Sequence, residues 1–252
     1  MEFIERGHIM NNWKQAFVLA KFEIRESKQI FIYLFLYYCL FISLFVMISY
    51  LVGDFYFGGL DIFYLLLFTF VPFWIRPKEF QYQKTHGDIW ASPAVITLNQ
   101  LPIKRDIIIK SRFILYFIYS FPFQLFLLVS LYLLTPNMQT NMSPISYISF
   151  SIIWLSFGVY AGLSIVTTDA GDQYGKGKRK LYLTLSFGIL IAIILLILCF
   201  GLIFSYGIVH WTIIFAQKWP FISAAISTLL AFLGFKHAQQ HMKKTMEKID
   251  YL

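Results

Sequence analysis

The sequence predicts an all-α integral membrane protein with six transmembrane helices. Of its 252 residues, 58% are hydrophobic and only 13% are charged, well below the roughly 25% that is usual in soluble domains. The apolar residues form runs of the length that crosses a hydrocarbon core about 30 Å thick. Lys and Arg gather in alternate segments between these runs, as they do in multi-pass membrane proteins.

Six uncharged apolar runs are long enough to span a bilayer as helices, each needing about 20 residues. They cover residues 30–52, 57–75, 113–134, 145–166, 181–204 and 219–235. Asp61, close to one end of the second run, is the only Asp, Glu, Lys, Arg or His in them. Pro72 and Pro122 also lie inside runs, where each removes a backbone hydrogen bond and can kink the helix.

The positions of the basic residues predict the orientation of the chain. All but one of the 21 Lys and Arg residues lie in 1–29, 76–112, 167–180 or 236–252, and the exception is Lys218. Because Lys and Arg in short loops resist translocation, these four segments and both termini are expected in the cytoplasm. The net charge of +8 therefore needs no nucleic acid partner to explain it.

Residues 181–217 form one uncharged stretch, too long for a single span. Two spans there would place the basic tail on the outer side. We therefore expect one span followed by an outer interfacial or re-entrant segment over 205–217, which contains His210 and Trp211.

The first 29 residues predict a cytoplasmic amphipathic interface helix rather than a cleavable signal, because charges run through them. Helical spacing puts Trp13, Phe17 and three neighbours on one face and Lys21, Arg25 and two other lysines on another. The first face also contains Ala16, Ala20 and Ile24, and the second contains Lys14 and Lys28. A solvated helix packed on another subunit is the open alternative. The expected organisation is thus 1–29, a six-helix domain over 30–235, and a basic tail over 236–252.

The sequence offers no catalytic residues and no metal site. The loops leave no room for a soluble catalytic domain, and an intramembrane proton relay or protease would need more ionisable groups than Asp61. Residues 171–178 resemble a phosphate loop but have the wrong spacing. His237 and His241 lack a third metal ligand, so a solvated helix face is expected there. Cys39 and Cys199 are expected to be small buried hydrophobes.

Gly158 and Gly162 have the small-xxx-small spacing that allows helices to approach closely. Packing of the fourth span against another helix is the expected use. Whether that helix belongs to the same subunit is open.

The inner segment 76–112 has a middle part, 89–98, that is too apolar for a free loop and too short to span a bilayer. It is expected to lie on the membrane or on a protein surface. Pro102 disfavours helix at Leu101 and is well placed to begin a new helix. Lys110 and Arg112 then fall near the lipid headgroups, just before the third span.

Leu101-Pro102-Ile103-Lys104-Arg105, followed by an Ile-rich turn and Lys110-Ser111-Arg112, resembles the membrane subunits of ABC type-2 transporters. The resemblance implies a cytoplasmic coupling helix over 84–98 that docks into a separate ATPase, with the next residues fixing the return to the bilayer. The implied coupling residues are Lys84, Ile89, Trp90, Leu98, Leu101, Pro102, Lys104 and Arg105. The sequence departs from the family at 84–88, Lys-Thr-His-Gly-Asp, where an acidic residue and a Gly-Thr pair are commoner.

The resemblance implies a permease subunit of an ATP-driven exporter in a bacterial cell membrane, without enzymatic activity of its own. ATP and Mg would be bound by the cytoplasmic ABC ATPase, and a second permease subunit, identical or related, would complete the path. The expected cargo is amphipathic or apolar: a peptide, an antimicrobial compound or a lipid-linked molecule. The alternative is a non-transporting immunity or sensor scaffold that binds a toxin or partner protein through its outer segment. Residues with AT-rich codons suggest a low-GC Gram-positive source.

Overall fold

The computed structural model describes the backbone of residues 2–52, 59–69, 81, 83–84, 89–173, 191, 195, 199 and 206–249. Four helices in this part of the chain are long and apolar enough to cross a membrane. They are α2 (Gln29–Val52), α6 (Arg105–Leu134), α8 (Pro144–Thr167) and α11 (Pro220–Lys248). These helices confirm the helical prediction at 30–52, 113–134, 145–166 and 219–235, and they indicate a membrane protein.

The second and fifth predicted spans are described only in part. Helix α3 (Gly59–Thr69) lies within the predicted span 57–75, and residues 70–75, with Pro72, lie outside the described residues. Of the predicted span 181–204, the structure describes only Ile191, Leu195 and Cys199, all helical. Six spans with cytoplasmic termini therefore stay a prediction.

Two helices extend well beyond their predicted spans. Helix α6 begins at Arg105 with Asp106 in its first turn, where an acidic side chain favours the helix dipole, and it continues through Pro122. Helix α11 continues to Lys248 because Ala238, Met242 and Met246 repeat at helical spacing and are buried. The segment expected as a separate tail is thus mostly the end of the last helix.

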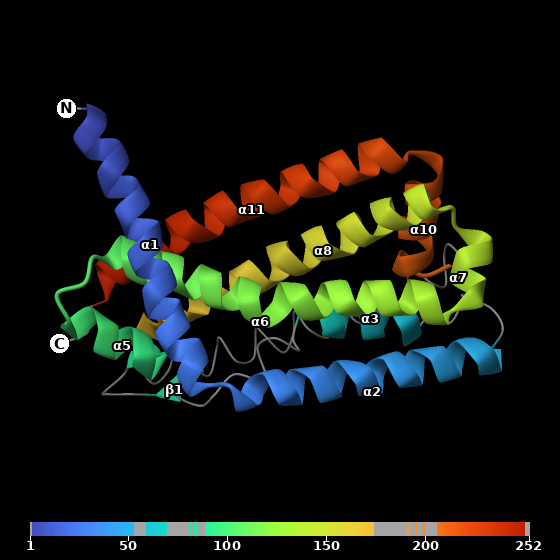
Figure 1. Cartoon of the computed structure of the whole chain (residues 1–252), viewed down its shortest axis with the longest axis horizontal. Helices are drawn as coiled ribbons and strands as arrows, with labels where there is room; N and C mark the ends of the chain where they lie inside the picture. Colours follow the sequence, from blue (N-terminus) through green and yellow to red (C-terminus); the bar gives the residue numbers. More distant parts are fainter. Residues whose placement is uncertain are drawn as a thin grey trace.

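The long helices run side by side, α3 lies alongside them, and the other short elements gather at the two ends of the bundle (Figure 1). Helix α1 (Glu2–Glu26) crosses α6 at one end, close to α5 (Pro93–Gln100) and both termini; we call this the α5 end. Helices α7 (Pro136–Asn141) and α10 (Ile208–Lys218) lie at the opposite end, the α10 end. The described parts of the segments expected in the cytoplasm lie at the α5 end, and α7 and α10 at the other.

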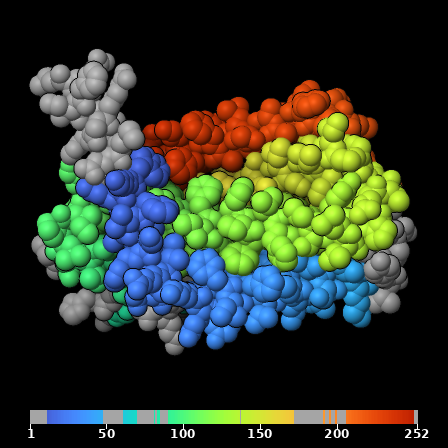
Figure 2. Space-filling model, viewed as in Figure 1, coloured from blue at the N-terminus to red at the C-terminus, as the bar shows by residue number. Residues whose placement is uncertain are grey.

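The buried side chains form two clusters along the bundle. The main cluster joins α2, α3, α6, α8 and α10, and its largest fully buried members include Tyr38, Tyr64 and Phe150. The end cluster joins α5, α6, α8 and α11 at the α5 end, where Val95, Ile108 and Met242 are all fully buried. Side chains fill the spaces between the neighbouring long helices in the space-filling view (Figure 2).

A small antiparallel sheet at the α5 end was not predicted. The coupling helix expected over 84–98 was wrong in its first half, because Lys84 and residues 89–91 are in strands and the helix begins only at Pro93. Strand β2 (Ile89–Ala91) pairs with β1 (Gln83–Lys84) on one side and with β3 (Asp172–Gln173) on the other. Gly171 precedes β3 with φ of 91°, and a Cβ there would lie 2.5 Å from Cβ of Ala91, so glycine is required. The sheet ties the expected inner segments 76–112 and 167–180 together.

Candidate functional site

The α5 end contains most of the residues that the sequence singles out. Helix α5 begins after Ser92 with Pro93 in its first turn, where the missing N–H of proline costs nothing. It stops at Leu101 in extended backbone, as the following Pro102 requires. The chain then turns through Ile103 and enters α6 at Arg105. The break in the helix at Leu101 is confirmed, but the new helix begins three residues after Pro102 and not at it.

Leu98 and Trp90 have a framework role in this arrangement. Leu98 is 9% exposed and packs into the end cluster with Val95 of the same helix. Trp90 is half-buried in the central strand of the sheet, paired with Lys84 and Asp172. For Ile89 the structure describes the backbone, which pairs with Gln173. The inward side chains therefore hold the segment on the bundle.

The remaining residues of the predicted set lie on the outside, and we call them the α5 edge. Leu101 is 49% exposed. The α5 edge consists of Lys84, Leu101, Pro102, Lys104 and Arg105, all exposed. It presents an apolar turn beside three basic side chains, a combination suited to an acidic or mixed protein surface.

Helix α1 is fixed across the first turns of α6 by polar contacts along its length. Near its middle, Nδ2 of Asn12 donates to Oδ2 of Asp106 at 3.5 Å, and Nζ of Lys110 lies 5.1 Å from the centre of the Trp13 ring. Nearer its end, Glu23 and Arg112 form a buried ion pair. Figure 2 shows α1 lying across α6.

The ion pair is the most buried charged contact that the structure describes between α1 and α6. Side chains of Arg112 and Glu23 are 2% and 8% exposed. Burial raises the pKa of the Glu23 carboxyl above its ordinary value of 4.5; Arg112 opposes this increase and the charge of Asp169 adds to it. Loss of one partner would leave a buried charge uncompensated.

The face of α1 that was predicted as one apolar surface is divided in the structure. Ala16 and Ala20 are fully buried against the bundle, and their small side chains allow a close crossing. Trp13 and Phe17 are 39% and 52% exposed. Ile24, on the same helical face as these two aromatics, packs on the main cluster.

Lys21 and Arg25 are exposed, as predicted for the basic face. Trp13, Phe17 and Ile24 share one face of α1. Ile24 packs on the main cluster, so this face of α1 is turned toward the long helices. The basic face lies beside it on α1, and the position of this helix at a membrane surface stays a prediction.

Asp61 anchors α10 at the other end of the bundle. Its side chain is buried, and its carboxylate accepts from the backbone N–H groups of Ile208 at 2.7 Å and Val209 at 2.8 Å. A carboxylate on the first N–H groups of a helix satisfies donors that have no partner within it. A Cβ at Gly207 would lie 2.3 Å from Oδ2 of Asp61, so the approach requires glycine.

Gly158 and Gly162 pack α8 against α6 of the same chain. The hydroxyl of Tyr116 donates to the carbonyl oxygen of Gly158 at 2.6 Å, and a Cβ at Gly162 would lie 1.6 Å from that hydroxyl oxygen. Gln124 lies beside Gly158 and donates to the carbonyl of Phe68 at 3.0 Å. The two glycines of the small-xxx-small motif thus pack against side chains of their own subunit.

No group of three or more His, Cys, Asp or Glu side chains among the described residues could hold a metal ion. Cys39 and Cys199 are free thiols, half-buried and exposed respectively. Of the glycine-rich stretch 171–178, only residues 171–173 are described, and Gly171 serves the turn into β3.

Sequence reasoning missed the buried ion pair, the sheet and the α10 anchor. Glu23 carried a usable signal, because it follows Ala16 and Ala20 at helical spacing on the buried stripe. The anchor had no local signal, since Asp61 and Ile208 are 147 residues apart.

No family model, curated protein or solved structure matches this chain.

Proposed function

We propose that this chain is the permease subunit of an ATP-driven ABC exporter in a bacterial cell membrane. The observation that carries the proposal is the α5 edge: exposed residues on a segment that is clamped to the bundle by the end cluster and the sheet. A surface of this kind can pass a push from a partner into α6, because α5 leads directly into that helix.

In this proposal the chain binds no nucleotide itself. A cytoplasmic ABC ATPase would bind ATP and Mg, contact the α5 edge and move α5 when it closes. A second permease subunit would face this one across the membrane path. An amphipathic or apolar cargo agrees with an interior rich in aromatic and small polar side chains, such as Tyr64, Trp154 and Gln124.

The test is whether an ABC ATPase co-purifies with the full chain when the chain is expressed together with its neighbouring genes and purified in detergent. Leu101→Asp and the double variant Lys104→Glu/Arg105→Glu place repulsive or polar groups on the α5 edge without touching the core. We expect each to reduce the bound ATPase and its cargo-stimulated hydrolysis at least tenfold.

The matched control is Gln139→Lys, an exposed charge change on α7 at the α10 end that keeps a donor for the carbonyls of Tyr132 and Leu133. It should leave ATPase binding unchanged. Equal binding by the α5-edge variants and the native chain, with the ATPase present, would contradict the assignment of this surface.

The non-transporting scaffold keeps one observation in its favour. Helix α10 is held by Asp61 and exposes Trp211, and Trp219 follows it; their exposed fractions are 40% and 52%. Aromatic side chains of this kind are common at the centre of protein interfaces. Protection of cells from a toxin by this chain in the absence of any ATPase would favour the scaffold over the permease.

A further inference from the structure

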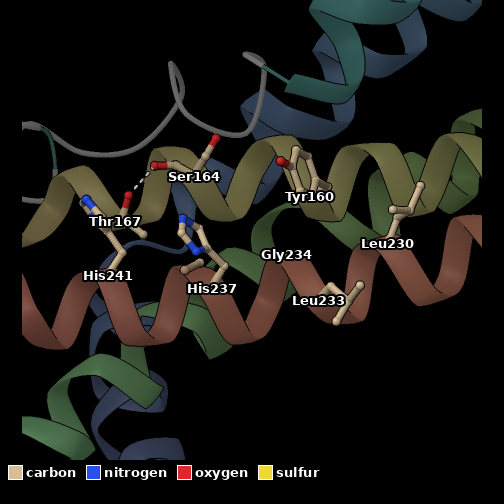
Figure 3. Close-up of a pocket in the computed structure, with 9 residues that line it drawn as sticks. Tyr160, Ser164, Thr167, Leu230, Leu233, Gly234, His237 and His241 are labelled. Carbon is tan, nitrogen blue, oxygen red and sulfur yellow. Dashed lines mark hydrogen bonds between the residues drawn. The ribbon is translucent and has the colours of Figure 1, made fainter.

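A groove of about 470 Å³ separates α8 from α11 on the surface of the bundle (Figure 3). Three of its residues come from α8 and six from α11. They are Tyr160, Ser164, Thr167, Leu230, Leu233, Gly234, His237, Ala238 and His241. The groove is separate from the α5 edge and contains the two histidines that the sequence left without a role.

The groove changes from apolar to polar along its length. Leu230 and Leu233, 56% and 54% exposed, line the part that falls within the predicted last span. His237 and His241 line the other part, opposite Ser164 and Thr167 (Figure 3). The polar part is directed toward the α5 end, because Met242, next to His241, packs in the end cluster.

Glycine gives the apolar part its shape. The Tyr160 ring of α8 lies against Gly234 of α11, where a Cβ would come within 2.4 Å of Cδ2 of the ring. The missing side chain lets the ring lie across α11. The result is an aromatic wall beside the two leucines, which suits a hydrocarbon chain.

The donors of the polar part are its imidazoles. The hydroxyl of Ser164 donates to the carbonyl of Ala161 and that of Thr167 to the carbonyl of Ser164, so both protons are already used within α8. Each imidazole of His237 and His241 has an N–H to offer. Their ring centres are 6.3 Å apart, close enough for one phosphate group to accept from both.

Two lysines of α11 extend the polar part of the groove with positive charge. On α11, Lys244 lies three residues after His241 and Lys248 seven after it, so helical spacing puts both on the face of the groove. Both lysines are exposed. The acid of this stretch, Glu247, falls on another face. Asp169, in the short 3-10 helix that follows α8 (Thr168–Ala170), is directed into the interior at 1% exposure.

We propose that this groove binds one anionic phospholipid from the leaflet at the α5 end. The imidazoles of His237 and His241, with Lys244 beyond them, hold the headgroup phosphate, and one acyl chain lies along Leu230, Leu233 and Tyr160. A free phosphate would leave the apolar half empty, whereas a lipid fills both halves. Basic sites between helices at the cytoplasmic side are a recurring form of lipid recognition. The inference rests on the membrane placement of α8 and α11 and not on transport.

The test is native mass spectrometry of the full chain in detergent, titrated with dioctanoyl phosphatidylglycerol or with dioctanoyl phosphatidylcholine. We expect a one-to-one adduct with phosphatidylglycerol, formed with at least tenfold preference over phosphatidylcholine. His237→Leu/His241→Leu should reduce that preference about tenfold or more. His237→Gln/His241→Gln, which keeps an N–H donor at each position, should restore part of it. Both substituted side chains, His237 and His241, are exposed, so folding is checked by an unchanged melting temperature.

Two controls make the proposal refutable. Lys243→Gln removes a charge from α11 on a face away from the groove and should leave lipid binding unchanged. An equal loss in Lys243→Gln and the leucine variant would show unspecific attraction to a basic surface and overturn the proposal. The proposal would also be overturned if inorganic phosphate reduced the phosphatidylglycerol adduct at the same concentration at which phosphatidylglycerol binds, since the acyl chain would then contribute nothing to binding.

Discussion

Glu23 and Arg112 place opposite charges where α1 crosses α6, almost without access to water. The pKa of Glu23 lies above 4.5 because burial disfavours its charged form, and Asp169 adds to this while Arg112 opposes it. Between 4.5 and the raised value, the folded protein holds more protons than the unfolded chain. The free energy of unfolding contributed by Glu23 therefore decreases as the pH rises through this window and is recovered as the pH falls.

Glu23→Gln should remove this pH dependence. In detergent, the melting temperature of the native chain relative to the variant should increase as the pH is lowered from 7 to about 4.5. The difference between the two proteins isolates Glu23 from the other carboxyl groups. No relative increase over this window, or a relative decrease as the pH is lowered below 4.5, would show that Arg112 dominates and lowers the pKa.

Asp61 is predicted to stabilise α10 specifically. Asp61→Ala removes the acceptor for the N–H groups of Ile208 and Val209, and loss of a charged cap of this kind costs about 1–3 kcal/mol. Amide hydrogen exchange in α10 should accelerate at least fivefold, because its first turn loses its partners. Ser143→Ala, which removes the cap on Ser146 at the start of α8, should leave α10 exchange unchanged. Unaltered α10 exchange in Asp61→Ala would refute the anchor.

At the residue scale, the sequence located these groups but not their partners. It placed Asp61 near one end of a span and Arg112 just before another. The partners lie far along the chain: Asn12 and Asp106, Glu23 and Arg112, Asp61 and Ile208. Helical spacing reports which face a residue occupies, whereas only the fold reports which element covers that face.

Helices α6 and α8 meet closely because two glycines of α8 accept the Tyr116 side chain. Gly162→Ala would place a methyl group 1.6 Å from the Tyr116 hydroxyl oxygen, and forced overpacking costs roughly 1–3 kcal/mol. We expect the melting temperature in detergent to fall by several degrees.

A second change separates local crowding from a general effect of alanine. Tyr116→Ala/Gly162→Ala removes the ring that the new methyl group meets, so the Gly162 substitution should cost much less in that background. An equal cost in both backgrounds would contradict the packing. So would a loss of dimer without a loss of melting temperature, since the glycines would then lie between subunits.

At the scale of elements, hydrophobic length predicted the long helices well and their ends poorly. Helix α6 begins at Arg105 and α11 ends at Lys248, both beyond the apolar runs. A predicted span ends where the apolar run ends, but a helix continues for as long as one of its faces is buried by other elements. Ile108 of α6 and Met242 of α11 lie beyond the apolar runs and are buried in the end cluster. The sheet could not be predicted from the sequence, because strands of two or three residues carry no periodic signal.

At the scale of the whole molecule, the charge pattern and the fold agree on a division into two ends. Helices α1 and α5 and the end of α11 lie together, and α7 and α10 lie at the far end (Figure 1). The proposed ATPase surface and the polar part of the lipid groove both lie toward the first end. Both proposals therefore require that the α5 end faces the cytoplasm.

Cysteine accessibility in intact cells tests that requirement most directly. In a chain with Cys39 and Cys199 replaced by serine, Thr97→Cys on α5 and Gln139→Cys on α7 introduce single exposed thiols at opposite ends. A membrane-impermeant maleimide should label Gln139→Cys in intact cells and Thr97→Cys only after the cells are opened. Labelling of Thr97→Cys in intact cells, with Gln139→Cys protected, would contradict the account.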